Sequence, residues 1–355
     1  MPPKYQKIAE ELRIHIQAGK FSDAHTLPTE FAIAQEYQVS RQTVRQALSL
    51  LARDGLIEKR QGSGSYIRQS PAEPPGQAKK VIAVITTYIS DYIFPSILRE
   101  VETVLAENNC TPSLFATRNQ VYNERRILAG LLESPVDGIL VEGTKSALPN
   151  PNLDLYRQLL DRNIPLVFMN GNYAGLQGAF SVLDDNYGGG RMLVEYLEKK
   201  GHRRIAGIFK SDDIQGHQRY AGYADALRDL NLPMEDWQLF WYNTESKARF
   251  LAEDLPEPLI QALGRCSAVV CYNDEIACRI EVCMMRRGVN IPQELAIVSF
   301  DNSQYSDLSS KPITSLSHGE NNVGRLAAEL LIRLMQGEAC RSETAPWVLK
   351  EKESG

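Results

Sequence analysis

The chain of 355 residues contains no long apolar segment. A helix that crosses a bilayer needs about 18 or more consecutive apolar residues, and no run in this sequence approaches that length. The first residues, Met1-Pro2-Pro3-Lys4-Tyr5, also lack the apolar stretch of a secretory signal. We therefore expect a cytoplasmic protein that makes no contact with a membrane.

Motifs for metal binding and catalysis are missing as well. The six cysteines form no Cys-x-x-Cys pair and lie apart from any histidine cluster, which argues against a metal site. Gly-x-Ser-x-Gly and His-Glu-x-x-His are absent, and the five histidines suggest no catalytic triad. We predict that the protein is not an enzyme and has no catalytic residues, metal or cofactor.

Positive charge is scarce overall, because the net charge is −5, but it is unevenly distributed. Residues 1–69 contain ten Lys and Arg against seven Asp and Glu, a net of +3, so the remainder carries −8. A basic segment on an acidic protein is expected when only that segment contacts nucleic acid. The chain is also long enough for two or three folding units.

The basic segment, residues 1–68, is predicted to form a small helical domain with a β-hairpin. Apolar residues from Ile8 to Ile16 recur at helical spacing. Thr29 and Ser40 each precede a further helical segment and are expected to cap it. The predicted elements are helices over 5–18, 29–37 and 40–54 and strands over 56–60 and 65–68, with a hairpin tip at 61–64.

The second and third of these helices, joined by a tight turn, form a helix-turn-helix arrangement whose second member can lie in the major groove. Arg41 and Arg45 can each hold guanine through two hydrogen bonds, and Gln42 can do the same with adenine. The glycine-rich hairpin tip lets the backbone approach a phosphate closely. A protein-interaction module with a solvated, arginine-rich face is the alternative.

The order of residues 4–68 resembles the DNA-binding domain of the GntR regulator family. The resemblance is carried by Tyr5 to Leu12, Leu27–Glu30 (LPTE), Val39–Leu48 (VSRQTVRQAL), Leu51, Gly55–Ile57 and Gly62–Ile67 (GSGSYI). It implies a winged helix-turn-helix that binds double-stranded operator DNA through Lys4, Thr29, Glu30, Ser40, Arg41, Gln42, Thr43, Arg45, Gln61 and Gly62. Glu30 is acidic, so it is either a cap or ion-pair partner or a residue that discriminates between bases.

A linker over residues 69–80, with three prolines, precedes a second domain over 81–355 that alternates strands and helices. Short apolar runs suit parallel strands that are buried on both faces. These runs cover 81–86, 138–141, 166–169, 205–209, 268–271 and 296–300, and helical patterns such as 186–199 and 215–230 lie between them. The alternation predicts a doubly wound α/β architecture.

This second domain resembles the sensor of the LacI/GalR regulators, which has a periplasmic-binding-protein fold. The motifs are Val182–Gly190 (VLDDNYGGG), Gly201–Ala206 (GHRRIA), Gln218–Tyr223 (QRYAGY), Val270–Ala277 (VCYNDEIA) and Ile297–Asn302 (IVSFDN). The resemblance implies two doubly wound lobes joined by a hinge, with a small-molecule effector between them. It also implies a homodimer, with residues 81–355 as the ligand-binding and dimerisation domain.

Two further motifs, Thr86–Pro95 (TTYISDYIFP) and Val141–Ala147 (VEGTKSA), are similar to those of bacterial arabinose-responsive repressors, which join a GntR head to a LacI-type sensor. That similarity implies the sugar L-arabinose as the effector. The resemblances, together with the chemistry of side chains at strand ends, indicate an effector site made of Tyr88, Asp91, Tyr92, Phe94, Glu142, Lys145, Asn170, Arg219, Asn273, Asp274 and Asp301.

The chemistry of these residues suits a monosaccharide. Carboxylates at strand ends accept hydrogen bonds from adjacent hydroxyls, the Arg219 guanidinium donates a planar fork, and aromatic rings cover the C–H face of the sugar. Several residues have another interpretation. Asp91 and Lys145 are alternatively hinge or surface ion pairs, Tyr92 and Phe94 are alternatively core residues, and Asp301 is alternatively a loop cap.

The sequence therefore predicts a transcriptional repressor of sugar-utilisation genes that leaves its operator when L-arabinose binds. The main alternative is the same class of regulator with a different sugar or a purine as effector. A pyridoxal-phosphate enzyme fused to a GntR head would need a longer chain. A transport receptor would need an export signal and leaves the basic head unexplained.

Overall fold

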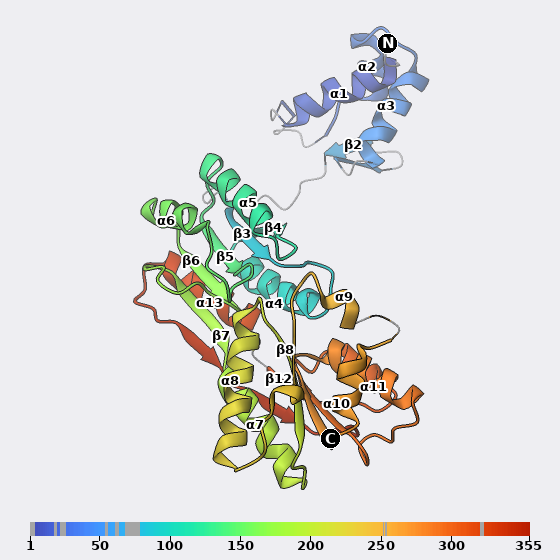
Figure 1. The fold of residues 1–355 in the computed structure, drawn as a ribbon. Coiled ribbons are helices and arrows are strands. Elements are labelled where there is room, and N and C mark those ends of the chain that lie inside the picture. Colours follow the sequence, from blue (N-terminus) through green and yellow to red (C-terminus); the bar gives the residue numbers. More distant parts are fainter. Residues whose placement is uncertain are drawn as a thin grey trace. The chain divides into compact units, whose positions relative to one another are not determined.

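The computed structural model describes residues 4–17, 20–21, 26–53, 56–60, 64–67, 79–250, 252, 254–319 and 323–355. The chain divides into two compact units, Met1–Ala78 and Lys79–Gly355. Figure 1 shows the helical first unit and the larger α/β second unit.

The first unit is a three-helix domain with a two-stranded hairpin. Helix α3 (Arg41–Arg53) packs against both α1 (Lys4–Gln17) and α2 (Glu30–Glu36). Strand β1 (Ile57–Arg60) pairs antiparallel with β2 (Gly64–Ile67). The core consists of buried apolar side chains: Ile8, Ala9, Leu12, Leu27, Ile33, Val44, Ala47, Leu48, Leu51 and Ile57.

Both helix caps predicted for this unit are present. Thr29 Oγ1 accepts a hydrogen bond from the backbone N–H of Ala32 at 3.2 Å. Ser40 Oγ accepts one from the N–H of Thr43, also at 3.2 Å. Each cap satisfies a backbone donor that the first helical turn leaves without a partner, so each marks where its helix begins.

The second unit contains two six-stranded sheets, each with helices on both faces. The sheet of the N-lobe has the strand order β13-β7-β6-β5-β3-β4, and all of its strands are parallel. Its strands are β3 (Lys80–Thr86), β4 (Cys110–Ala116), β5 (Gly138–Glu142), β6 (Leu166–Met169), β7 (Phe180–Asp184) and β13 (Glu343–Ala345).

The sheet of the C-lobe has the order β14-β12-β11-β10-β8-β9. Its strands are parallel except for β14, which runs antiparallel to β12 at the edge. They are β8 (Ile205–Lys210), β9 (Leu239–Tyr242), β10 (Ala268–Cys271), β11 (Ala296–Phe300), β12 (Thr314–Ser317) and β14 (Val348–Lys350).

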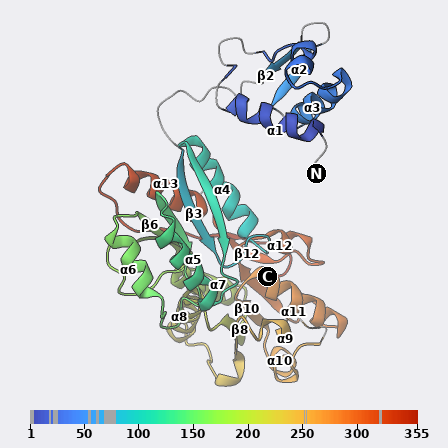
Figure 2. The same ribbon diagram turned by 90° about the horizontal axis from the view of Figure 1, so that it is seen from above.

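Helices cover both faces of the N-lobe sheet. Helices α4 (Phe94–Glu107) and α13 (Val323–Met335) lie side by side on one face, as Figures 1 and 2 show. Helices α5 (Val121–Glu133) and α6 (Leu153–Asp161) pack on the other. Every residue of β5 and β6 is buried, which explains why their sequences are continuously apolar up to the strand end.

The C-lobe has the same layered organisation. Helices α7 (Asn186–Lys199) and α8 (Ile214–Asp229) cover one face, and α10 (Glu257–Leu263) and α11 (Asp274–Arg286) cover the other. Shorter helical segments are η1 (Asp236–Gln238), α9 (Lys247–Phe250) and α12 (Gln304–Leu308). Glycine allows α7 and α8 to approach closely, because a Cβ at Gly222 would lie 1.9 Å from the carbonyl oxygen of Tyr187.

The chain passes between the lobes three times. The first crossing joins β7 to α7, the second joins β12 to α13, and the third joins β13 to β14. Three crossings form a hinge about which two lobes can rotate. Among the described residues, no helix is both long enough and apolar enough to cross a bilayer.

The predicted fold class is confirmed: a winged helix-turn-helix unit precedes a two-lobed, doubly wound α/β unit. The six predicted strands of the second unit are all present. The strands that were not predicted are β4, β9, β12, β13 and β14. These strands lie at or next to sheet edges, and most are partly exposed. All of them except β9 (LFWY) also lack the continuous apolar run that marks a central parallel strand.

Candidate functional site

A cavity of about 160 Å³ lies between the two lobes. Its wall is formed where strands of both sheets end, namely β3, β5, β6 and β7 of the N-lobe and β8, β9, β10 and β11 of the C-lobe. In open α/β sheets ligands bind outside the carboxyl ends of the strands. The volume is below the roughly 300–1,000 Å³ of pockets for drug-sized ligands, so the cavity suits a smaller molecule.

Arg219 on α8 is a buried cation of the cavity, with 4% of its surface exposed. Its Nε donates to Asn186 Oδ1 at 2.9 Å, and its Nη1 donates to the carbonyl oxygen of Tyr272. Its Nη2 lies 3.3 Å from Asp301 Oδ1. The guanidinium also lies over the ring of Phe300, 4.1 Å from the centroid, so it is held rigidly in one plane.

Asp301, directly after β11, links Arg219 to the N-lobe. Its Oδ2 accepts a hydrogen bond from the Tyr92 hydroxyl at 2.7 Å, and that hydroxyl accepts one from the backbone N–H of Asp274 at 3.0 Å. Burial, followed by the charge of Asp301, raises the pKa of Tyr92 well above its ordinary value, so the hydroxyl stays protonated. Tyr92 thus fastens the two lobes together beside the cavity.

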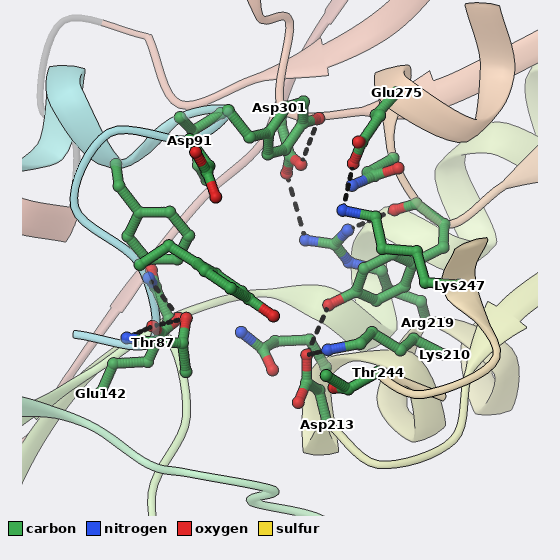
Figure 3. Close-up of a pocket in the computed structure, with 18 of the residues that line it drawn as sticks. Thr87, Asp91, Glu142, Lys210, Asp213, Arg219, Thr244, Lys247, Glu275 and Asp301 are labelled. Atoms are coloured by element: carbon green, nitrogen blue, oxygen red, sulfur yellow. Dashed lines mark hydrogen bonds and ion pairs between the residues drawn. The ribbon is translucent and has the colours of Figure 1, made fainter. Parts of the chain in front are cut away.

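Glu142, at the end of β5, is the acceptor on the N-lobe side (Figure 3). Its carboxylate accepts from the N–H and hydroxyl of Thr87, at 2.9 and 2.5 Å, and from Asn170 Nδ2 at 3.1 Å. Burial raises the pKa of Glu142, and the hydrogen bonds from Thr87 and Asn170 act in the opposite direction. These bonds hold the Glu142 carboxylate at the cavity wall.

Two ion pairs complete the C-lobe wall. Lys210, the last residue of β8, lies 2.5 Å from Asp213 Oδ2, and Lys247 lies 2.6 Å from Glu275 Oε2. All four residues line the cavity and are visible in Figure 3. The cavity therefore presents carboxylates, ammonium groups and a guanidinium together, an arrangement that can bind several hydroxyl groups at once.

The structure brings most of the predicted effector residues to this cavity: Tyr88, Asp91, Tyr92, Phe94, Glu142, Asn170, Arg219, Asn273 and Asp301. Their positions between residues 88 and 301 show that the cavity is assembled from distant parts of the chain. Asp91 has its side chain in the cavity, and Tyr92 joins the lobes, so neither is placed as an isolated surface or core residue.

Lys145 and Asp274 do not line the cavity. The Lys145 ammonium lies 2.5 Å from Glu245 Oε1, and its backbone N–H donates to Asn119 Oδ1, so the residue connects the lobes outside the cavity wall. The Asp274 side chain is fully buried. Both of its carboxylate oxygens accept hydrogen bonds from serine groups behind the wall, on Ser299, Ser303 and Ser315.

Further cavity residues were not predicted. They are Thr87, Ile93, Asp184, Lys210, Asp213, Gln215, Tyr242, Thr244, Lys247, Tyr272 and Glu275. Some of them carried a usable signal, because Lys210 to Asp213 follow a predicted strand and Tyr272 and Glu275 belong to a recognised motif. Tyr242 is the last residue of β9 and Thr244 follows it, and because this strand was not predicted, neither residue was expected at a strand end.

The first unit presents the predicted DNA-contacting residues mainly on one pair of helices. Lys4, Thr29, Ser40, Arg41, Gln42 and Arg45 are exposed, and Glu30 and Thr43 are half-buried. Glu30 Oε2 accepts from Arg45 Nε at 2.9 Å, and the Arg41 guanidinium lies 5.0 Å from the centroid of the Phe31 ring. Gln61 and Gly62 lie outside the described residues.

Comparison with known proteins agrees with this division. Residues 4–67 match a family described as bacterial regulatory proteins, gntR family, and residues 194–354 match a periplasmic binding protein-like domain. The second unit is similar to a solved periplasmic binding protein/LacI transcriptional regulator from Alkaliphilus metalliredigens, complexed with D-xylulofuranose. That structure has a TM-score of 0.67 and 25% identity, and the match covers 78% of this chain and 98% of the other.

Two curated relatives match almost the whole chain, and both are named arabinose metabolism transcriptional repressor. The relative from Geobacillus stearothermophilus is 36% identical over 94% of this chain and 92% of its own length. The relative from Halalkalibacterium halodurans is 35% identical over 95% of this chain and 91% of its own length. The predicted resemblance is thereby confirmed, and the chain belongs to the family of arabinose metabolism transcriptional repressors, in which a gntR-type head precedes a periplasmic-binding-protein-like body.

Proposed function

We propose that this chain represses genes of L-arabinose use and leaves its operator DNA when L-arabinose binds in the interlobe cavity. The observation that carries the proposal is the cavity itself, where Arg219 and Asp301 of the C-lobe face Glu142 of the N-lobe. The names of the two curated relatives supply the sugar.

The polar groups of the cavity favour a sugar over a purine. Vicinal hydroxyls need donors and acceptors close together, which the charged side chains of both lobes offer. A flat base would be held best between two parallel rings. The rings of Tyr88 and Phe94 lie 5.9 Å apart but are inclined at 60°, so they form an edge-to-face pair rather than a slot for a base.

The proposed mechanism is a rotation of the lobes about the three crossings. A sugar that contacts both lobes stabilises their closed arrangement, because it binds that form better than an open one. If the same rotation changes the spacing or order of the two DNA-binding heads of a dimer, sugar binding weakens operator binding and operator binding weakens sugar binding. Their coupling is reciprocal and is typically about 1–3 kcal/mol.

We propose further that the functional form is a homodimer. Two-fold symmetric heads match the two half-sites of an operator. Helix α12 supplies an apolar surface for self-association, since Leu308 is 84% exposed and Tyr305 is 47% exposed. Analytical ultracentrifugation of the wild type and of Leu308→Asp tests this, with a monomeric variant expected and a dimeric variant contradicting this choice of surface.

Isothermal titration with L-arabinose, D-galactose, D-xylose and hypoxanthine tests the effector. We expect saturable binding of L-arabinose, loss of binding in Arg219→Ala, and unchanged binding in Arg228→Ala. Arg228 is a matched control because it lies on the same helix but is exposed. Binding of hypoxanthine or another sugar instead would establish the alternative effector.

Fluorescence anisotropy with duplex DNA that the protein has selected from a random library tests the sign of the response. We expect L-arabinose to weaken operator binding by about five-fold or more, since that is the lower end of typical allosteric coupling. Tighter operator binding with sugar would show that the sugar is a corepressor.

We also propose that the chain has no enzymatic activity and needs no cofactor. Among the described residues, no group of three or more His, Cys, Asp and Glu is placed to hold a metal ion. An absorption band of a pyridoxal chromophore in the purified protein would contradict the proposal.

A further inference from the structure

The three crossings between the lobes each contribute one side chain to a single cluster, here called the hinge node. Asp184 ends β7 at the first crossing, His318 follows β12 at the second, and Trp347 lies between β13 and β14 at the third. His318 Nδ1 lies 3.0 Å from Asp184 Oδ1, and the rings of His318 and Trp347 have centroids 4.5 Å apart. The hinge is therefore held by direct contacts between all three of its segments.

The hinge node also touches the sugar cavity. Asp184 lines the cavity, and the indole of Trp347 lies 5.6 Å from the guanidinium carbon of Arg219. Trp347 is tightly packed, because a Cβ at Gly189 would lie 2.7 Å from its Cδ1 atom. A side chain that is this constrained cannot absorb a shift of Arg219 locally, so it passes the shift to the third crossing.

The contacts of the hinge node leave two buried polar atoms without a hydrogen-bond partner in the described part of the chain. They are Nε2 of His318 and Nε1 of Trp347. Burying such groups without partners is unfavourable. The cost is consistent with a site kept for a role other than stability.

His318 is surrounded by charged and titratable groups from several elements. They are Asp184 at the end of β7, Arg219 on α8 and Asp301 after β11. Tyr92, just before α4, and Arg99, on α4, line a second cavity together with His318. Burial and the positive charge of Arg219 lower the pKa of His318, whereas the negative charges of Asp184 and Asp301 raise it. The second pair prevails, so the pKa is raised overall. The protonated ring is thus favoured in the arrangement that the structure shows.

We propose that the hinge node couples occupation of the sugar cavity to operator affinity, with His318 and Trp347 as the positioning residues that hold Asp184 and Arg219 against the crossings. This inference rests on the proposed function of the cavity. It assigns the effect of sugar on operator affinity to side chains at the hinge, which are different from the side chains that bind the sugar.

The test compares operator dissociation constants with and without saturating L-arabinose in the full-length protein. In His318→Gln and Trp347→Phe we expect sugar to bind within about three-fold of the wild type, because neither residue lines the cavity. We expect the ratio of the two operator constants to fall at least five-fold toward one. His202→Gln and Trp237→Phe, which replace residues of the C-lobe away from the hinge, should keep the wild-type ratio.

A pH series on the wild type needs no variant and gives an independent readout. The lobes are joined across the cavity in this arrangement, so we take it as the form that encloses the sugar. The pKa of His318 is raised above its ordinary value of 6.5 in this arrangement, chiefly by Asp184 acting against burial. The protonated ring therefore favours this form at low pH, and sugar affinity should fall as pH rises from that ordinary value through the raised pKa. His318→Gln should flatten the profile, and His202→Gln should not.

The outcomes separate the two proposals. If the wild type binds no sugar, the proposed function fails and the hinge-node inference fails with it. If the wild type responds normally but both node variants keep the full operator response and the wild-type pH profile, only the hinge-node inference is overturned.

Discussion

The hydroxyl of Tyr92 lies 2.7 Å from Asp301 Oδ2, and this hydrogen bond joins residues 209 positions apart in the chain across the cleft between the lobes. Tyr92 adopts a positive φ of 54°, and Asp301 a positive φ of 93°. Non-glycine residues in this conformation are uncommon and concentrate at functional sites. The bond therefore marks the place where lobe closure and the ligand cavity meet.

Replacing Tyr92 with Phe should weaken sugar binding. The change removes the donor to Asp301 and the acceptor for the Asp274 N–H but keeps the ring. One such bond contributes about 0.5–1.5 kcal/mol net, so we expect sugar affinity to fall about two- to ten-fold. Calorimetry measures the effect, with Tyr305→Phe as control because Tyr305 lies on α12 beside the same ring. Unchanged affinity would show that lobe closure does not depend on this bond.

Replacing Arg219 alone should destabilise the protein more than replacing Arg219 and Asp301 together. Arg219→Met leaves the buried Asp301 carboxylate without its cation, which costs about 3–5 kcal/mol of unfolding free energy. Arg219→Met with Asp301→Asn removes both charges and should recover much of that stability. Asn is chosen because it tolerates the positive φ at this position. Denaturant unfolding gives stability, while calorimetry should show no sugar binding in either variant.

Asp274 should make stability depend on pH. Burial, followed by the charge of Asp301, raises the pKa of Asp274 to about 6 from an ordinary value of 3.8. The folded state then binds more protons than the unfolded state, so this residue's contribution to stability falls as pH rises between about 4 and 6, by about 3 kcal/mol at most. Asp274→Asn should flatten that part of the profile of unfolding free energy against pH. An unchanged slope would contradict the role of Asp274.

Gly222 should tolerate no side chain. A Cβ there would lie 1.9 Å from the Tyr187 carbonyl oxygen, so α7 and α8 would have to separate. Such overpacking typically costs about 1–3 kcal/mol. Gly130→Ala on α5 is the matched control, since no atom lies within 4 Å of its added Cβ, and it should stabilise the helix by about 0.5–1 kcal/mol. Thermal unfolding distinguishes the two, and equal melting temperatures would refute the packing argument.

Glu30 should restrain DNA binding by pairing with Arg45, whose Nε lies 2.9 Å from it. Glu30→Gln frees that guanidinium for phosphate and removes a negative charge, so affinity for non-operator DNA should rise. The plot of log affinity against log salt concentration should become steeper by about 0.9, the change expected for one additional phosphate contact. Anisotropy in a salt series measures this, with Glu36→Gln, an exposed site on the same helix, as control. A loss of operator affinity would instead show that Glu30 contacts the DNA.

Much of the fold follows from local sequence patterns. The fully buried strands β5, β6, β8, β10 and β11 are apolar except for at most one polar residue each. The caps at Thr29 and Ser40 depend on hydrogen bonds between residues three positions apart. Such interactions are readable because sequence neighbours make them. The short strands β12, β13 and β14 depend on pairing partners elsewhere in the sheets, so their own sequences did not reveal them.

The sequence alone determined that the chain is a gntR-type head on a periplasmic-binding-protein-like body, and that polar residues at strand ends form the candidate site. Only the tertiary structure decided which of them share the cavity. Asp274 and Asp301 both lie near strand ends of the C-lobe, yet Asp274 is turned toward buried serine hydroxyls and Asp301 toward Arg219. Side-chain direction there depends on partners many residues away, and so does the meeting of Asp184, His318 and Trp347 at the hinge.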